Sequence, residues 1–221
     1  MKILFAAFTL FITLSVNSQV EVGVFAGPQA TGVRYTIGEK KQESSLKIGV
    51  NVGLQMKVPF EGRLSFAPSI MYNMRGYKVD KLAGGIAFPP DSLAINVDTR
   101  FHTVEVAFLL QHDFKLEGGH FFFRIGPSLD FALFGNEKFT RNDGSNIDRS
   151  MKFSFSDYGH YLASAILQFG YDAKNGIFFY AHYNYGLTTM NNWDYGPGIG
   201  NRAAGFTIGK WLKPGSKRKI Q

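Results

Sequence analysis

The stretch LKIGVNVGLQMKV, residues 46–58, decides the fold class because every second residue in it is apolar. The apolar row consists of Leu46, Ile48, Val50, Val52, Leu54, Met56 and Val58. A period of two places this row on one face of a β-strand, whereas a helix would scatter it. If the row faces a protein core, the chain is a soluble barrel or sandwich. If the row faces outward, the chain crosses a membrane.

Further segments along the chain repeat this alternation. They cover residues 20–27, 46–58, 63–79, 101–116, 121–134, 161–171, 177–187 and 202–212. No segment has a sustained helical period, and the separators are rich in Gly, Pro, Asn and Asp, which favour turns. The sequence therefore predicts eight strands.

The predicted connections alternate between short and long. The short ones are residues 59–62, 117–120 and 172–176, and the long ones are 28–45, 80–100, 135–160 and 188–201. In an up-and-down barrel this alternation gathers every long loop at one end, as in outer-membrane barrels with their even strand number. The predicted fold is all-β, an eight-stranded antiparallel up-and-down transmembrane β-barrel in the cell outer membrane.

The first residues, MKILFAAFTLFITLSVNSQV, combine one lysine with an apolar run over residues 3–16. This pattern is typical of a secretory signal peptide, and we expect cleavage after Ser18. A spanning helix would need about 20 apolar residues. The expected organisation is a signal peptide at 1–18, an outer-membrane barrel at 19–212 and a basic periplasmic tail at 213–221.

Composition narrows the chemistry that is available. The chain has no cysteine, which excludes disulfides, a thiolate nucleophile and a lipid-modified cysteine. The formal net charge is +7, and the tail KPGSKRKIQ carries part of the excess. We expect a solvated tail and no nucleic-acid partner, while contacts of the tail with anionic lipid or peptidoglycan remain open.

The rows that are not apolar indicate which face meets lipid. In segments 101–116 and 121–134 these rows mix charges with Gly, Ala and Ser, small residues that a narrow eight-stranded interior needs. We therefore expect the apolar rows to face lipid and the polar rows to fill the barrel. The predicted interior polar residues are Glu105, Asp113, Arg124, Asp130 and His182.

Two finer expectations follow from the strand positions. A hairpin closed around Gly118 and Gly119 pairs residues whose numbers sum to 237, which sets Asp113 opposite Arg124 as an interior charge pair. The alternative is an exposed pair on a soluble sheet, worth less than about 1 kcal/mol. Aromatic residues near strand ends predict girdles at the lipid headgroups. They are Tyr72, Tyr77, Phe101, Phe114, Phe121, Tyr161, Tyr171, Tyr185 and Trp211.

Three segments carry a family resemblance: VEVAFLLQHDF (104–114), RIGPSLDFAL (124–133) and YAHYNYGLTTM (180–190). They resemble the PorT-like outer-membrane β-barrel family over nearly all of the mature chain. The resemblance implies a barrel in outer-membrane lipid, inserted by the barrel-assembly machinery, and for some relatives a part in protein secretion. Ala107 stands where a Pro is usual, His182 where an Arg is usual, and the chain ends in a basic tail instead of an aromatic residue.

The sequence contains no strong motif for catalysis, metal binding or phosphate binding. The five histidines show no metal-ligand spacing, and GPGIGN (196–201) precedes a strand, so it lacks the helix N-terminus that binds phosphate. Ser156, Asp157 and His160 lie close together in the sequence, but a nucleophile must also contact its base. The sequence therefore predicts no catalytic residue, no cofactor and no metal, and His182 is expected to be a hydrogen-bonded interior group.

Three functions remain open. The first is a closed barrel acting through external loops on a protein or glycan partner, as an adhesion, assembly or secretion accessory; such a barrel is filled by side chains and is not expected to transport solutes. The second is a lipid hydrolase or acyltransferase at the rim. The third is an exported soluble carrier of the lipocalin type.

Overall fold

The computed structural model describes residues 20–83 and 87–212. The predicted signal peptide and basic tail lie outside the described residues. In the described part of the chain, no helix has the length and hydropathy needed to cross a bilayer.

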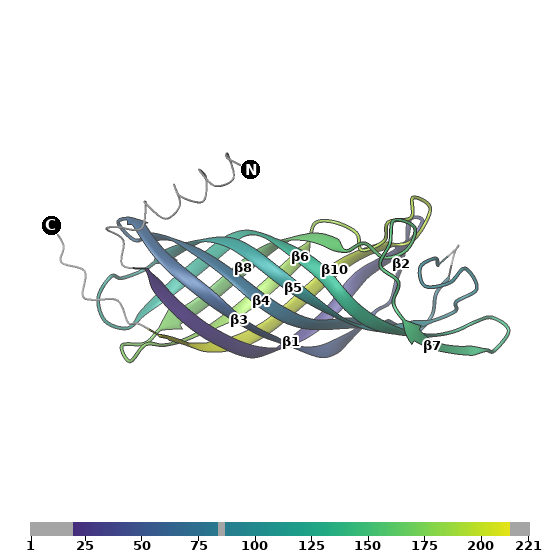
Figure 1. Cartoon of the computed structure of the whole chain (residues 1–221), viewed down its shortest axis with the longest axis horizontal. Coiled ribbons are helices and arrows are strands. Elements are labelled where there is room, and N and C mark those ends of the chain that lie inside the picture. Colours follow the sequence, from purple (N-terminus) through teal and green to yellow (C-terminus); the bar gives the residue numbers. More distant parts are fainter. Residues whose placement is uncertain (1–19, 84–86, 213–221) are drawn as a thin grey trace, which may run out of the picture.

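Strands build the molecule, and eight of them close into an antiparallel barrel. The barrel order is β1, β3, β4, β5, β6, β8, β9 and β10, with β10 pairing back onto β1. Two short strands, β2 and β7, extend β1 and β6 at one end of the barrel (Figure 1). The strands are β1 (Glu21–Ile37), β2 (Lys40–Gln42), β3 (Ser45–Glu61), β4 (Leu64–Val79), β5 (Val97–Asp113), β6 (His120–Thr140), β7 (Asn146–Ser150), β8 (Tyr161–Asp172), β9 (Ile177–Gly186) and β10 (Gly198–Trp211). The predicted eight-stranded barrel is confirmed.

The long and short connections separate to opposite ends. The turns β3–β4, β5–β6 and β8–β9 lie at one end, and β2, β7 and the long loops lie at the other (Figure 1). Each short turn contains a glycine with positive φ: Gly62 at 49°, Gly118 at 73° and Gly176 at 81°. A residue with a Cβ rarely adopts these angles, so glycine allows the chain to reverse tightly there. We call these the short-turn end and the loop end.

The first strand is far longer than the sequence suggested. The prediction ended it at Gly27 because Gly-Pro usually marks a turn, but β1 continues to Ile37. Pro28 pairs with Val50 of β3, while the ladder to β10 is interrupted between Ala26 and Gln29. Proline has no N–H to donate, and a local gap on one side of the strand accommodates it without ending the strand.

Other strand boundaries also differ at the loop end. β6 continues to Thr140 and returns as a hairpin through β7, a region predicted to be loop. β5 begins at Val97, four residues before its predicted start. β4, β5 and β6 have 16, 17 and 21 residues, whereas about 9–11 residues span a bilayer. The barrel wall therefore extends well beyond a membrane at its loop end.

The outer face carries the apolar rows. Ile48 and Val52 are 73% and 51% exposed, whereas Asn51 and Gln55 on the opposite row are each 2% exposed. The outward row of β5 and the residue after it runs from Val104 to Phe114 and is apolar except for His112; its ten residue steps are about 33 Å along the strand. At a tilt near 45° this covers about 23 Å, close to the ~25 Å apolar band of membrane barrels. The exposed row of the opening stretch is a lipid-facing row.

The aromatic girdle is only partly as predicted. Tyr72, Phe114, Phe121 and Tyr161 lie on the outer face, with exposed fractions of 37–77%, and Tyr171 and Tyr185 are half-buried on outward rows. Tyr77, Phe101 and Trp211 instead point inward and are at most 5% exposed. Nearness to a strand end does not fix the side of the sheet, which depends on the residue's place in the alternation.

Candidate functional site

The centre of the barrel holds an ion triad. Arg75 of β4 places one guanidinium nitrogen 2.6 Å from Glu105 Oε2 and the other 3.0 Å from Asp130 Oδ2. Glu105 and Asp130 are direct neighbours across β5 and β6. All three side chains are at most 3% exposed. Since two carboxylates this close would repel each other, the shared cation is what makes their burial tolerable.

Neutral side chains complete the triad. Asn73 donates to Glu105 Oε2 at 2.7 Å, Asn184 to Glu105 Oε1 at 3.2 Å, and the Thr103 hydroxyl to Asp130 Oδ1 at 2.9 Å. Glu105 and Asp130 were expected in the interior, and both are buried. Arg75 was not among the predicted residues, although its place on the inward row of residues 63–79 was a signal available in the sequence.

Arg124 does not lie opposite Asp113, so the predicted pairing is wrong: the numbers of paired residues sum to 235 instead of 237. Arg124 pairs with Gln111, and Asp113 pairs with Phe122. The turn is wider than the sequence suggested, with the Phe114 N–H donating to the Phe121 carbonyl at 3.0 Å. Since a shift of two in the sum of residue numbers preserves the alternation, both charges still point inward.

Arg124 is paired with amides instead of a carboxylate. Its Nε lies 2.6 Å from Gln111 Oε1, and its Nη1 lies 2.8 Å from Gln55 Oε1 and 3.3 Å from Gln168 Oε1. The guanidinium carbon also stands 4.3 Å from the centre of the Phe122 ring. Arg124 is 1% exposed and lies on β6 between Asp130 of the triad and the short-turn end, so we call Arg124 with its three glutamine partners the Arg124 layer.

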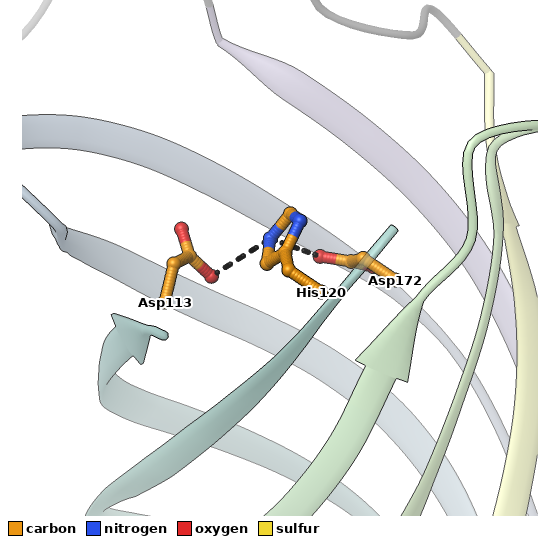
Figure 2. Close-up of side chains that lie close together, drawn as sticks. All are labelled: Asp113, His120 and Asp172. Atoms are coloured by element: carbon orange, nitrogen blue, oxygen red, sulfur yellow. Dashed lines mark ion pairs between the residues drawn. The ribbon is translucent and has the colours of Figure 1, made fainter. Parts of the chain in front are cut away.

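A second charged cluster lies at the short-turn end (Figure 2). His120 Nε2 is 3.3 Å from Asp113 Oδ1 and 3.7 Å from Asp172 Oδ2. Lys57 Nζ is 2.9 Å from Asp113 Oδ2 and 3.4 Å from Asp172 Oδ2. These residues come from β3, β5, β6 and β8; Asp113 and His120 flank one hairpin turn, whereas Lys57 and Asp172 come from distant parts of the sequence. Asp113 was predicted to be interior, whereas Lys57, His120 and Asp172 were not singled out.

The space beside His182 inside the barrel is small. His182 is 8% exposed, and its Nδ1 is 3.4 Å from the Thr207 hydroxyl. It lines a cavity of about 10 Å³ together with Gln29, Asn51 and Asn184, which is room for about one water molecule. At the loop end, Tyr35, Tyr77 and other apolar side chains fill the bore. Along the described part of the chain, the interior is therefore closed to solutes.

Ion pairs fasten the long loops to one another. Arg141 binds Asp91 Oδ2 through Nε at 3.2 Å and Nη2 at 2.7 Å. Arg149 of β7 binds Glu137 at 2.7 Å and the Pro90 carbonyl at 2.7 Å. Partial burial raises the pKa of Asp91, but the Leu93 N–H and the Arg141 guanidinium outweigh that effect and hold the pKa below its ordinary value. The loop after β4 is thus attached to the β6–β7 hairpin.

The serine, aspartate and histidine of the rim do not form a catalytic arrangement. His160 Nδ1 is 3.0 Å from the Ala132 carbonyl, and its ring stacks on Phe131. The Ser156 hydroxyl contacts the Ser154 hydroxyl at 3.4 Å, and Asp157 accepts from Ser154. The structure gives no hydrogen bond between Ser156 and His160 among the described residues. The Ser156 hydroxyl and the His160 ring, which would be the nucleophile and the base, are therefore not in contact.

Comparison with known proteins shows the family to which the chain belongs. The sequence pattern described as outer membrane protein beta-barrel domain matches residues 14–192, well over half of the chain. The chain belongs to this family. It is an outer-membrane protein with an apolar belt and a filled interior. No curated protein matches the chain.

The solved structures that are similar to this outer-membrane protein at low identity include two small barrels. One is Ail, the attachment invasion locus protein of Yersinia pestis, with 13% identity and a TM-score of 0.42, covering 86% of this chain and 99% of that chain. The other is Neisserial surface protein A, with 12% identity and a TM-score of 0.41, covering 87% of this chain and 97% of that chain.

Outer-membrane barrels have short periplasmic turns and longer external loops. This rule assigns the loop end, with its fastened loops, to the cell exterior. It assigns the cluster of Asp113, His120 and Asp172 to the periplasmic mouth (Figure 2). The exported soluble carrier is thereby set aside, because the apolar rows face outward and the family is an outer-membrane family.

Proposed function

We propose that this outer-membrane barrel acts through its external loops as an interaction, assembly or secretion accessory with a protein or glycan partner. The observation that carries the proposal is the filled interior, because a chain of this kind has only its two ends with which to act. Along the bore, the Arg124 layer, the central triad and the buried apolar cluster around Tyr35 and Tyr77 follow one another and fill the interior. The proposal therefore does not include transport of solutes.

The loop end has features of a contact surface. Phe155 is 98% exposed and Tyr195 is 83% exposed, on two neighbouring loops. These loops are joined where Asn192 donates its N–H to the Asp157 carbonyl at 3.0 Å and its side-chain amide to the Ser154 carbonyl at 3.1 Å. Exposed aromatic side chains on a fixed frame are common anchors in binding surfaces. Holding the loops in place also lowers the entropy cost of binding.

Site-specific photo-crosslinking in living cells tests the proposal. A photoreactive amino acid at Phe155 or Tyr195 should give discrete adducts with protein or glycan, and their yield should fall when Asn192→Ala removes the side-chain amide bond between the two loops. The same label at Val52, on the lipid-facing row, is the matched control and should give lipid adducts only. Absence of loop adducts across growth conditions, or solute flux through the purified barrel in liposomes, would contradict the proposal.

The rim enzyme is the second candidate, and no specific observation favours it. It predicts that purified barrel alters phospholipid or lipopolysaccharide acyl chains, and that Ser156→Ala abolishes the change. Mass spectrometry of lipids incubated with the two proteins separates the two functions. If the wild type releases acyl chains and the variant does not, the result would support the enzyme and contradict the proposal that the barrel acts only through loop contacts.

The finer relationship to PorT-like barrels is also a proposal. Three short segments, residues 104–114, 124–133 and 180–190, support this relationship. The relationship implies that the barrel-assembly machinery inserts the protein and that the protein takes part in secretion. Deleting the gene and measuring proteins in the culture medium tests the secretion role. If the deletion leaves secretion unchanged while the loop crosslinks are seen in cells that make the protein, the secretion role is wrong and the general proposal stands.

A further inference from the structure

The cluster at the periplasmic mouth has a histidine in the orientation of a metal ligand. His120 Nδ1 is 3.1 Å from the Gly118 carbonyl oxygen, which can only accept a hydrogen bond. In the neutral ring Nδ1 therefore carries the hydrogen, and Nε2 presents a lone pair. Metal-binding histidines are commonly fixed in this way by a backbone carbonyl.

The Nε2 lone pair faces carboxylate oxygens (Figure 2). Among the described residues, Nε2 has no hydrogen-bond partner, although Asp113 Oδ1 and Asp172 Oδ2 lie 3.3 Å and 3.7 Å away. Three electron-rich atoms facing one another are unfavourable unless a cation lies between them. The Lys57 ammonium supplies part of this positive charge at the two carboxylates. Beside Nε2 itself, the cation is either a proton on that nitrogen or a metal ion.

Neighbouring groups orient both carboxylates. Trp211 Nε1 donates to Asp172 Oδ1 at 2.9 Å, and the Gln111 amide donates to Asp113 Oδ1 at 2.5 Å. Asp172 Oδ2 is thereby turned toward His120 instead of into the wall. Such outer hydrogen bonds fix the ligands of metal sites, and losing one typically costs about 10–100-fold in metal affinity.

The spacing fits a small divalent ion. In a tetrahedral site with bonds of about 2.0–2.1 Å, two ligand atoms stand about 3.4 Å apart. The two distances from Nε2 are 3.3 Å and 3.7 Å, and the ligand atoms of all three residues lie within 4.8 Å of one another. One imidazole nitrogen and two carboxylate oxygens are a donor set that zinc accepts, with water in the fourth position.

We propose that Asp113, His120 and Asp172 form a zinc-type divalent metal site at the periplasmic mouth of the barrel. The metal would join the β5–β6 hairpin to the end of β8, which comes from a more distant part of the sequence. Lys57 is the competing cation, because its ammonium binds the other oxygen of Asp113 and the same oxygen of Asp172. The inference is independent of the function proposed for the loops and replaces the expectation of no metal site.

Metal titration of the refolded, untagged barrel in detergent tests the proposal. Zn²⁺ measured by calorimetry should bind with a stoichiometry of one, and Co²⁺ should develop the intense visible absorption of a tetrahedral site. His120→Gln should weaken binding by more than about 100-fold, since it removes a direct ligand. Lys57→Gln should tighten binding by about tenfold or more, because a positive charge within a few ångströms is gone.

His112→Gln is the matched control, since His112 lies in the same region but on the outward row. Each variant must show the same heat-dependent gel mobility as the wild type, which demonstrates a folded barrel. Equal affinity of wild type and His120→Gln would overturn the proposal. So would the absence of binding in both the wild type and Lys57→Gln, which would assign the cluster to a protonated histidine.

Discussion

Replacing Arg75 by Met tests whether the interior triad is a true ion network. The substitution keeps a long side chain but removes the cation that lies 2.6 Å from Glu105 and 3.0 Å from Asp130. Both carboxylate side chains are 0% exposed, so water cannot replace the lost partner. Asn73, Asn184 and Thr103 remain as hydrogen-bond donors, but they bring no charge.

The expected cost follows from the burial of the two carboxylates. Removing one partner of a buried ion pair costs about 3–5 kcal/mol of the free energy of unfolding. Here one guanidinium serves two acids, so we expect a loss at the upper end of that range. The triple variant Arg75→Met, Glu105→Gln, Asp130→Asn removes every charge and should recover more than half of the loss, because buried ion pairs can be replaced by neutral groups at little cost.

Urea titration of the barrel in lipid vesicles, followed by tryptophan fluorescence and gel mobility, measures these energies. Arg100→Met is the matched control on β5, where the side chain is exposed, and it should change stability by less than about 0.5 kcal/mol. If Arg75→Met costs no more than Arg100→Met, or if the triple variant is no better than the single one, the triad does not hold the interior together.

Three further predictions concern other parts of the barrel. Arg124→Met should cost about 2–4 kcal/mol in the same titration because it leaves buried glutamine oxygens without their donor; a neutral effect would refute the Arg124 layer. Gly27→Ala should destabilise the barrel by about 1–3 kcal/mol, because its Cβ would lie 2.0 Å from the Phe206 carbonyl oxygen. Gly200→Ala, also between β1 and β10, is the control and should be tolerated, since the nearest atom to its Cβ would be 3.9 Å away. Asp91, whose pKa is lowered in the folded state, stabilises the loop above its unfolded pKa of about 3.9, and this contribution is lost as the pH falls further. The hydrogen-exchange protection factors of residues 91–96, which correct for the intrinsic pH dependence of exchange, should therefore fall below about pH 4 in the wild type and be low at every pH in Asp91→Asn. Wild-type protection factors that do not change with pH would refute the linkage.

The fold was largely predictable because one physical signal sets it. Alternation in residues 46–58 fixes two faces, and the small residues of the polar rows show which face is crowded. Strand ends were harder to predict because local turn signals compete with the sheet. Gly27 and Pro28 have the composition of a turn, yet pairing with β3 carries the strand through them.

The interior sites were predictable only as a set of inward residues. Their partners depend on register, and one wider turn moved Arg124 from Asp113 to Gln111. His120 and Asp172 come from strands whose register the sequence does not fix, so no local spacing could signal their meeting. Arg75 could have been found by asking which cation on an inward row would offset Glu105 and Asp130.

The central claim is that hydrocarbon surrounds the outer rows while polar side chains fill the bore, and adjacent spin labels on β3 test it most directly. The chain has no cysteine, so Val52→Cys and Asn51→Cys each give a single nitroxide site in vesicles. The account predicts that the label at Val52 collides freely with oxygen dissolved in the lipid, and that the label at Asn51 is immobile and shielded. A lipid-exposed label at Asn51 with a packed label at Val52 would contradict the account.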